Sequence, residues 1–451
     1  MKPFTLGEIA AACGGRFVGT EEQKQICITS VERDSRQIQN GSLFLAIKGA
    51  RADGHDFIDK CYQQGAVCAL CEQAPKSTDK AYILVPSTLD AVKQIAKAYR
   101  RKFDIPVIGV SGSVGKTSTK EMLYAVLSQK YRTHKTQGNL NNELGVPLTL
   151  LAMPEDAEAA VIEMGISDFG EMSRLSEMVQ PTVCVLTVIG CCHLENLIDR
   201  DGVLKAKTEM FLHAADNAVC ILNGDDDKLS TVTAVRGRSP VFYGLSDTHR
   251  FYAEQIENNA EDGIRCTLCF DGKRLPVTIP AIGTYMVSNA LAGVAVGVTL
   301  GLSDEQLKNG VEAYQTVGSR ARVVNTSRIR IIDDCYNANP TSVQASLDTL
   351  MNFTGRKVAV LGDMKELGAD EATLHFDTGR YAKERGVDLV LAVGLLAAEL
   401  AKGADGQWFA DNEQLLAALP SLIHDGDTVL VKASHSMQFE QITQRLTEMF
   451  R

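Results

Sequence analysis

The sequence lacks an excess of positive charge. Its 451 residues include 46 Lys and Arg against 56 Asp and Glu, which gives a formal net charge of −10 at pH 7. Proteins that bind nucleic acid usually carry a basic face, so this balance argues against a nucleic-acid partner. A phosphorylated ligand would need individual lysine and arginine side chains placed in loops, because the chain as a whole repels anions.

The sequence also lacks a membrane span and an export signal. The stretch 275–303 carries no charged side chain, yet Pro276, Pro280 and Asn289 interrupt it, and many Gly and Ala residues dilute its hydrophobicity. It is therefore expected to be a buried, closely packed helix. Residues 1–14 contain Glu8 and no apolar core, so a signal peptide is not expected. These features favour a cytoplasmic protein.

Cysteine is abundant, but the pattern of a disulfide framework is missing. The twelve cysteines are scattered through apolar stretches such as Val67–Cys71, which is typical of a reduced, intracellular protein. Two Cys-x-x-Cys pairs, Cys68/Cys71 and Cys266/Cys269, lie about 200 residues apart and have no neighbouring histidine. Because a structural zinc site needs four ligands brought together, this spacing does not favour one.

The most informative stretch runs from residue 105 to residue 119. An apolar run at 105–110 suits a buried parallel strand and 116–129 suits a helix, so a loop of small residues connects the two. Glycines in such a loop let backbone N–H groups approach phosphate oxygens, and the helix N-terminus adds partial positive charge. The lysine would reach the β- and γ-phosphates and the threonine would contact Mg²⁺. The predicted phosphate loop comprises Gly112, Ser113, Val114, Gly115, Lys116, Thr117 and Ser118.

This loop departs from the usual eight-residue motif, whose first glycine would fall at Val110. A glycine-rich strand-to-helix turn with a solvated lysine is the alternative. Two further predicted strands lead to polar side chains, Glu163 at the end of 159–163 and His193 shortly after 182–188. The carboxyl ends of parallel strands meet at one sheet edge, so both are expected near Lys116, where Glu163 could contact Mg²⁺.

The length suggests about three domains. Residues 1–104 are predicted to form a small mixed α/β domain, 105–316 a nucleotide-binding α/β domain, and 317–451 a Rossmann-like α/β domain, so the fold class is α/β. In the third region a strand ends at Asp334, and Asn339 is expected to cap a helix that begins at Pro340. Polar loops near 34–36 and 53–55 can clamp a polar ligand, although such loops are more often hydrophilic connectors.

Together these motifs resemble the Mur ligases, the ATP-dependent enzymes that form amide bonds in peptidoglycan precursor synthesis. The resemblance covers the whole chain and rests on segments in the family's order, namely 112–118, 163–165, 193–195, 205–207 and 288–290. The family's short phosphate loop lacks the first glycine, which accounts for Val110. The resemblance implies three domains that bind, in order, a UDP-sugar, ATP and the incoming dipeptide.

Three stretches, 138–147, 333–340 and 361–368, are similar to the branch that joins D-alanyl-D-alanine to UDP-N-acetylmuramoyl-tripeptide. The Asp-Asn-Pro-Arg pattern of the diaminopimelate-adding branch is absent, and nothing in the third region suits folate. Two rivals stay open: an enzyme like folylpolyglutamate synthase, which would lack the 31–57 clamp, and an ATPase that makes no bond. The third residue of the tripeptide, diaminopimelate or lysine, also stays open.

The resemblance implies that ATP converts a peptide carboxylate into an acyl phosphate, which the dipeptide amine then attacks. Lys116 would neutralise the transferred phosphoryl group. Two Mg²⁺ ions are expected, the first held by Thr117 and Glu163 and the second by His193. Lys207, with Lys205 as the fallback, would be carbamylated and supply a further metal-directed carboxylate. For Lys207 the alternative is a solvated helix lysine.

Other roles follow from the same resemblance. The nucleotide would be contacted by Asn289, Arg320 and Asn337, and Asp334 would complete the catalytic site when the third domain closes. The substrates would be bound by Ser35, Arg36, Asp53, Gly54, His55, Asn139, Asn142, Asn339 and Ser434. Two departures are visible: Tyr285 replaces a histidine near adenine, and 432–437 reads Lys-Ala-Ser-His-Ser-Met instead of Lys-Gly-Ser-Arg-Gly-Met. The second leaves the dipeptide preference open. We expect a monomer.

Overall fold

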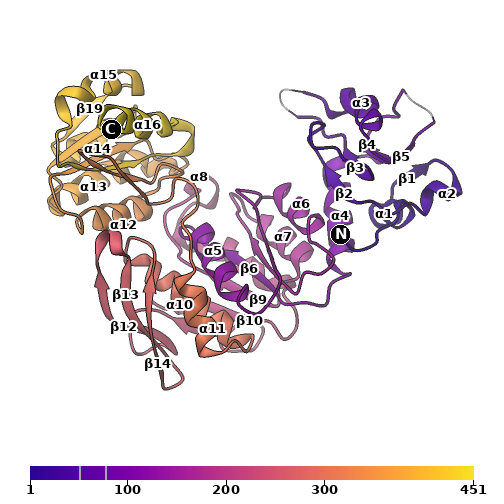
Figure 1. The fold of residues 1–451 in the computed structure, drawn as a ribbon, viewed down its shortest axis with the longest axis horizontal. Helices are drawn as coiled ribbons and strands as arrows, with labels where there is room; N and C mark the ends of the chain where they lie inside the picture. Colours follow the sequence, from indigo (N-terminus) through magenta and orange to yellow (C-terminus); the bar gives the residue numbers. More distant parts are fainter. Residues whose placement is uncertain (50–51, 77–78) are drawn as a thin grey trace.

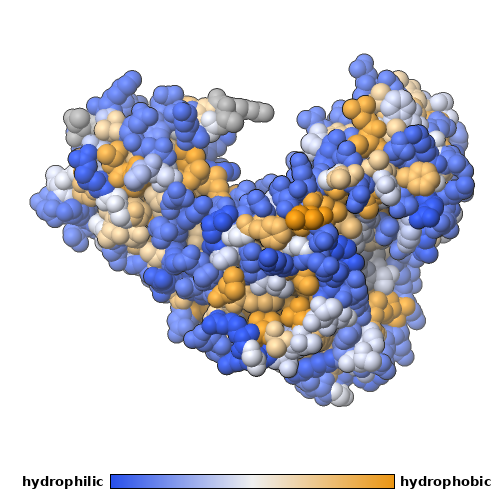
Figure 2. All heavy atoms as spheres, turned by 180° about the vertical axis from the view of Figure 1, so that it is seen from behind, coloured by the Kyte–Doolittle hydropathy of each residue, from blue (hydrophilic) through white to orange (hydrophobic). Residues whose placement is uncertain are grey.

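The computed structural model describes residues 1–49, 52–76 and 79–451, arranged as Figure 1 shows. Within this part of the chain the strands form three sheets accompanied by helices, which confirms the predicted α/β class. The first and third sheets lie at opposite ends of the molecule, and the second lies between them. Figure 2 shows a hollow between the two ends, with apolar side chains exposed near its floor.

The first sheet has the strand order β1-β5-β4-β3-β2, and only the edge strand β1 runs antiparallel to its neighbour. Its strands are β1 (Arg16–Val18), β2 (Ser30–Glu32), β3 (Ser42–Leu45), β4 (Cys68–Cys71) and β5 (Ala81–Leu84). Its helices are α1 (Leu6–Cys13), α2 (Glu21–Lys24), η1 (Gly54–Phe57) and α3 (Ile58–Gln63). Thr5 caps α1, because its hydroxyl accepts from the N–H of Glu8. We call the described residues up to 85 the N-terminal arm.

The second sheet has the order β14-β13-β12-β11-β10-β9-β6-β8-β7. The strands from β7 to β12 are parallel, and β12, β13 and β14 form antiparallel hairpins. The strands are β6 (Val107–Ser111), β7 (Thr133–Lys135), β8 (Ala159–Glu163), β9 (Val183–Leu186), β10 (Val219–Asn223), β11 (Val241–Tyr243), β12 (Phe251–Asn258), β13 (Ile264–Phe270) and β14 (Lys273–Ile279). The hairpin between β13 and β14 turns at Asp271 and Gly272, with positive φ at both residues.

Helices and short 3₁₀ turns connect the strands of this central unit. They are α5 (Lys116–Leu127), α6 (Gly145–Leu151), α7 (Glu171–Val179), α8 (Leu194–Leu197), α9 (Arg200–Thr208), η2 (Glu209–His213), η3 (Leu229–Thr231), η4 (Ala260–Asp262), α10 (Tyr285–Thr299) and α11 (Asp304–Glu312). The uncharged stretch 275–303 is thus divided between strand β14 and helix α10, which is buried against α5. Among the described residues, no helix is long and apolar enough to cross a membrane.

The third sheet has the order β15-β16-β20-β17-β18-β19, and all neighbours except β15 and β16 are parallel. Its strands are β15 (Arg322–Asn325), β16 (Arg330–Asp333), β17 (Lys357–Gly362), β18 (Leu389–Val393), β19 (Gln407–Phe409) and β20 (Thr428–Lys432). Its helices are α12 (Pro340–Leu350), η5 (Gly368–Asp370), α13 (Glu371–Glu384), α14 (Ala397–Ala404), α15 (Asn412–Leu422), η6 (His435–Met437) and α16 (Glu440–Met449). We call residues 322–451 the C-terminal arm.

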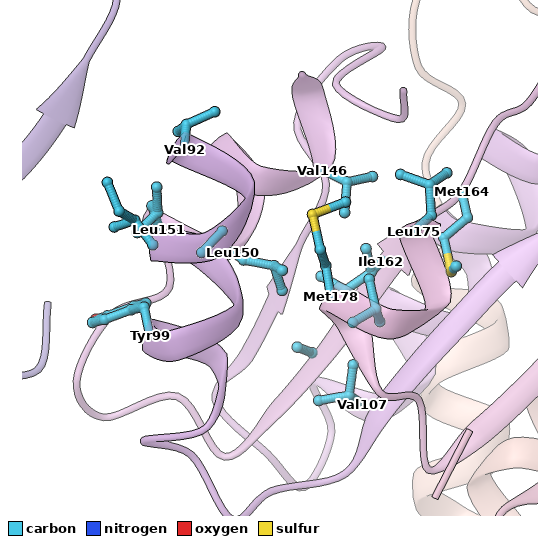
Figure 3. Close-up of a cluster of buried hydrophobic side chains, with 14 of the residues drawn as sticks. Val92, Tyr99, Val107, Val146, Leu150, Leu151, Ile162, Met164, Leu175 and Met178 are labelled. Atoms are coloured by element: carbon cyan, nitrogen blue, oxygen red, sulfur yellow. The ribbon is translucent and has the colours of Figure 1, made fainter. Parts of the chain in front are cut away.

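Helix α4 (Thr88–Arg100) joins the N-terminal arm to the central unit. Figure 3 shows its residues Val92 and Tyr99 near Leu150 and Leu151 of α6, and α4 packs against α7 as well. One cluster of buried apolar side chains runs without a break from the strands of the first sheet to those of the second. The buried Tyr99 hydroxyl donates to the carbonyl of Met153 at 2.9 Å and accepts from the N–H of Lys2 at 2.7 Å. The first two sheets therefore share a core.

Candidate active site

The carboxyl ends of β6, β8 and β9 meet at one edge of the second sheet and carry the predicted phosphate loop. β6 ends at Ser111 and α5 begins at Lys116, so the predicted strand, loop and helix are confirmed. Gly112 has a φ of 148°, and a Cβ there would lie 1.9 Å from Thr187 Oγ1, just beyond β9. Gly115, at a φ of 84°, turns the loop into α5. The N-terminus of α5 therefore lies where the strands end, as an anion site requires.

Lys116 folds back over its own loop. Its Nζ donates to the carbonyl of Gly112 at 2.7 Å and to that of Ser113 at 3.3 Å. Burial lowers the pKa of Lys116, and the positive charge of Arg320 lowers it further against the opposing effects of Cys192 and Glu163. The Ser113 hydroxyl accepts from the Cys192 thiol at 3.0 Å. The loop thus lies beside the thiol of Cys192, which the sequence pattern did not assign to it, and near the charge of Arg320, which was predicted to contact the nucleotide.

Glu163 is the buried carboxylate of this edge. Its Oε1 accepts from the Thr117 hydroxyl at 3.1 Å and from Asn141 Nδ2 at 2.8 Å. Its Oε2 is buried, makes no hydrogen bond to any described residue, and lies 3.8 Å from Lys120 Nζ. Lys120 is also fully buried and donates to the carbonyl of Thr136 at 2.8 Å. A buried carboxylate oxygen without a hydrogen bond is costly unless another group completes it.

The structure separates the two candidate lysines of α9. Lys207 is 1% exposed, whereas Lys205 is exposed and lies over the ring of Phe169. Burial, together with the charge of Lys116, lowers the pKa of Lys207 to about 8 against an opposing effect of Cys192. Lys207 therefore belongs to the group of charges around the phosphate loop.

His193 lies where the central unit meets the C-terminal arm. Its Nδ1 lies 2.5 Å from Glu366 Oε2, although the two are not aligned as in a hydrogen bond. The neighbouring N–H of Leu194 donates to the carbonyl of Glu366 at 3.0 Å. Burial lowers the pKa of His193, and the charges of Lys207 and Lys116 act in the same direction, while Glu366 opposes them. A neutral imidazole is the form that binds metal ions.

The edge of the third sheet presents Asp334 and its partners. Asp334 Oδ2 accepts from Lys432 Nζ at 2.6 Å and from the Ser346 hydroxyl at 2.6 Å. The same Lys432 Nζ donates to the carbonyl of Asn337 at 3.0 Å, while the side chain of Asn337 accepts from the N–H of Ala338. Lys432 is 3% exposed, so it holds the segment 334–337 in place from the buried side. Asp334 and the carbonyl of Asn337 thus share the same lysine at this edge.

Two other predicted substrate residues of this arm support the backbone. Asn339 caps α12 by accepting from the N–H of Ser342 at 2.9 Å, as the sequence predicts. Ser434 is buried, and its hydroxyl accepts from the N–H of Lys365 at 3.0 Å.

The predicted nucleotide contacts lie on either side of the loop. Asn289 of α10 is buried, and its Oδ1 accepts from the Thr119 hydroxyl at 3.0 Å. Arg320 stacks on the ring of Tyr336, with 3.8 Å between the guanidinium carbon and the ring centroid. Tyr336 in turn stacks on His435 at 5.5 Å between centroids.

The asparagine-rich loop contributes a residue other than the two predicted ones. Asn139 is exposed, and Asn142 accepts through Oδ1 from the N–H of Gly145 at 2.8 Å at the start of α6. Asn141, which lies between them, is the one that reaches Glu163. A loop has no side-chain periodicity, so the sequence could not distinguish these three residues.

The predicted sugar clamp lies on the N-terminal arm, apart from the phosphate loop (Figure 1). Arg36 pairs with Asp34, with 2.6 Å between Nη2 and Oδ2. His55 Nδ1 contacts Asp53 at 2.6 Å, and its Nε2 accepts from the N–H of Glu72 at 2.9 Å. Ser35 lies in the same turn as Arg36, and Gly54 begins η1.

The donor set around the loop fits Mg²⁺. Among the described residues, no group of three or more His, Cys, Asp or Glu side chains forms a protein-only metal site. Mg²⁺ does not need one, since it keeps several waters and is usually held by one or two carboxylates plus substrate phosphates. Glu163 Oε2, buried without a hydrogen bond beside Thr117 and the phosphate loop, is such a carboxylate oxygen.

Comparison with known proteins agrees with the family resemblance. Three family models match the chain, the Mur ligase family catalytic domain at 27–106, the Mur ligase middle domain at 110–297 and the Mur ligase glutamate ligase domain at 319–435. A Bacillus subtilis relative, UDP-N-acetylmuramoyl-tripeptide–D-alanyl-D-alanine ligase, is 37% identical over 98% of both chains. The chain belongs to the Mur ligase family.

Solved Mur ligases have the same fold over their whole length. A crystal structure of MurF from Acinetobacter baumannii matches with a TM-score of 0.92 at 32% identity, covering 99% of each chain. MurF from Thermotoga maritima in complex with ADP matches with a TM-score of 0.82 at 30% identity, covering 93% of this chain and 97% of that one.

Several polar residues of this Mur ligase site were not singled out from the sequence. They are Lys120, Asn141, Cys192, Glu366 and Lys432. Lys120 lies four residues after Lys116 in α5, which is about one helical turn. This spacing could have indicated that both lysines lie on the same face of the helix, toward the site. The contact between Glu366 and His193 joins positions far apart in the sequence, and no local pattern indicates it.

Proposed function

We propose that this Mur ligase uses ATP to join D-alanyl-D-alanine to UDP-N-acetylmuramoyl-tripeptide, forming ADP and phosphate. The observation that carries the proposal is the convergence of Lys116, Glu163, Lys207 and His193 around one sheet edge. The name of the B. subtilis relative, 37% identical over nearly the whole chain, supports the choice of substrates. The ADP complex of the T. maritima structure supports the use of ATP.

The chain's own residues suit a reaction that proceeds by positioning and charge neutralisation. Lys116 lies over the loop where the γ-phosphoryl group would be transferred to the tripeptide carboxylate, and its ammonium offsets the charge that develops there. The acyl phosphate that results is attacked by the dipeptide amine, the carbon–oxygen bond to phosphate breaks, and the amine loses a proton. Thr117, Glu163 and His193 would hold two Mg²⁺ ions, which supply further positive charge to the phosphates when bound.

Carbamylation of Lys207 is part of the proposal. Carbamylation requires a neutral amine, and burial has moved the pKa of this lysine to about 8. The carbamate would bring a negative charge between the cations of the site. The exposed Lys205, on the same helix, lacks that environment.

The three predicted domains would divide the work. Residues 1–104 would bind the UDP-sugar through Ser35, Arg36, Asp53, Gly54 and His55. Residues 105–316 would bind ATP, and 317–451 would bind the dipeptide and bring Asp334 and Asn337 to the nucleotide. Asn139, Asn142, Asn339 and Ser434 would support the substrates by shaping the loops around them. We further propose that the enzyme acts in the cytoplasm, where ATP is available, and that it acts as a monomer.

The proposal is tested by measuring ADP formation from ATP and Mg²⁺ in the presence of UDP-N-acetylmuramoyl-tripeptide, with and without D-alanyl-D-alanine. ADP release that needs both substrates, with a pentapeptide product by mass, is expected. Lys116→Ala should abolish it, while Lys308→Ala, at an exposed lysine of α11, should not. ADP release that ignores both substrates would instead identify an ATPase. Release driven by glutamate and a folate would identify a folylpolyglutamate synthase.

A further inference from the structure

Glu366 and His193 form an unusual contact between the C-terminal arm and the central unit. Both residues have left-handed backbone conformations, with φ of 64° for Glu366 and 52° for His193. Residues other than glycine rarely adopt this region, at a cost on the order of 1–3 kcal/mol each, and such strain concentrates at functional sites. Here two strained residues face each other across the interface between two sheets.

The strained conformation of Glu366 directs two of its groups to the same segment. Its carbonyl accepts from the N–H of Leu194 at 3.0 Å, and its carboxylate lies 2.5 Å from His193 Nδ1. Gly368, two residues on, approaches so closely that a Cβ there would lie 3.3 Å from the backbone nitrogen of Glu195. The turn 364–368 thus packs closely against residues 193–195. Glu366 makes the polar contacts between the two segments.

The geometry leaves His193 with one ring nitrogen for another partner. Nδ1 is buried and has the Glu366 carboxylate at contact distance, so Nε2 is the nitrogen available to a cation. Histidines that bind metal ions almost always donate their other N–H to a carboxylate, carbonyl or water, which fixes the tautomer and the ring orientation. In this chain the carboxylate comes from a different sheet from the histidine.

We propose that Glu366 is a positioning residue that orients His193 for a divalent cation and makes binding of that cation depend on the approach of the C-terminal arm. The proposal rests on the proposed function in one respect, the assignment of His193 as a metal ligand. Because binding linkage is reciprocal, the cation at His193 also holds the arm against the central unit. The contact between His193 and Glu366 would then couple cation binding to the docking of the C-terminal arm against the central unit.

The test is a titration of the full chain with Mn²⁺ in the presence of ADP, with bound Mn²⁺ measured by electron paramagnetic resonance. Two Mn²⁺ sites are expected in the unmodified protein, and His193→Ala should remove one. Glu366→Ala should weaken that same site about 10-fold or more, the usual effect of losing such a partner. Glu366→Gln should restore most of the affinity, since its amide oxygen can lie against Nδ1 as the carboxylate oxygen does. Glu399→Gln, which removes an ion pair with Lys402 inside the C-terminal arm, is the matched control.

The outcomes separate this proposal from the assignment on which it rests. If His193→Ala removes a Mn²⁺ site and Glu366→Ala leaves that site unchanged, Glu366 does not position the ligand and the proposal is overturned alone. If His193→Ala leaves both sites intact, the ligand assignment itself is wrong. A distance between spin labels on α9 and α14 provides the second measurement. It should shorten when Mn²⁺ is added to the unmodified protein with ADP, and should not change in Glu366→Ala.

Discussion

Raising the pH in the presence of carbon dioxide should convert Lys207 into a carbamate. The reaction needs the neutral amine, whose nitrogen bonds to the carbon of CO₂ with release of a proton. Because the pKa of Lys207 is lowered to about 8, the neutral fraction of this lysine should rise from about 3% at pH 6.5 to about 76% at pH 8.5. An ordinary lysine with a pKa of about 10.4 would change from about 0.01% to about 1% over the same range.

The direction of the pH effect follows from the direction of the pKa shift. Burial disfavours the charged ammonium, so the neutral amine is present above about pH 8 and is lost as the pH falls below it. Carbamylation exchanges a buried cation for a buried anion next to the cation of Lys116, which relieves the like-charge repulsion between the two lysines. The environment that lowers the pKa therefore also favours the product.

The assay is carbon-13 NMR of the protein under a fixed partial pressure of labelled CO₂ at pH 6.5 and pH 8.5. One carbamate signal per chain is expected to grow with pH in the unmodified protein and in Lys205→Arg, and to be missing in Lys207→Arg. Ligase activity should fall when CO₂ is removed and return with bicarbonate. The reasoning fails if the unmodified protein at pH 8.5 gives no more signal than Lys207→Arg.

Three further changes test other parts of the site and core. Gly112→Ala should weaken ADP binding at least 10-fold by calorimetry, because its Cβ would lie 1.9 Å from Thr187 Oγ1, and an unchanged affinity would contradict the loop geometry. Lys120→Met should lower the free energy of unfolding in urea by about 3–5 kcal/mol, since it leaves the buried Glu163 without its cation; a change below about 1 kcal/mol would contradict this. Leu150→Ala, fully buried in the cluster of Figure 3, should cost about 2–5 kcal/mol and lower the thermal transitions of the N-terminal arm and central unit together. Separate transitions would show that the two do not share a core.

The sequence was most informative where local pattern and sheet geometry coincide. The phosphate loop, Glu163 and His193 could be placed at one edge because each follows a short apolar run, and parallel strands end on the same side. The caps at Thr5, Ser303 and Asn339 were likewise predictable, because a capping pattern occupies four consecutive residues. In these cases the information lies within a few positions.

The same reasoning could not find residues whose role depends on distant partners. A lysine in a helix is usually predicted to be exposed to solvent. Lys120 is instead buried, with Glu121, Glu163 and the carbonyl of Thr136 as its partners. Asn141 and its two neighbours are equivalent in the sequence, and only the path of the loop gives one of them access to Glu163. Glu366 meets His193 only because the third sheet docks against the second.

The distribution of buried apolar contacts indicates where this molecule can move. The cluster of buried apolar side chains around α4 is continuous from the first sheet to the second. Displacing the N-terminal arm would therefore expose apolar surface to water, at a free-energy cost of about 25 cal/mol per Å². The third sheet has two cores of its own, and its buried apolar contact with the central unit is largely through Ile282. The remaining contacts in that interface include the polar ones of His193 and Leu194 with Glu366. Polar contacts exchange with water at little net cost. We therefore expect the segment 313–321, which connects α11 to β15, to act as a hinge, and the pair of His193 and Glu366 to form and break with its motion.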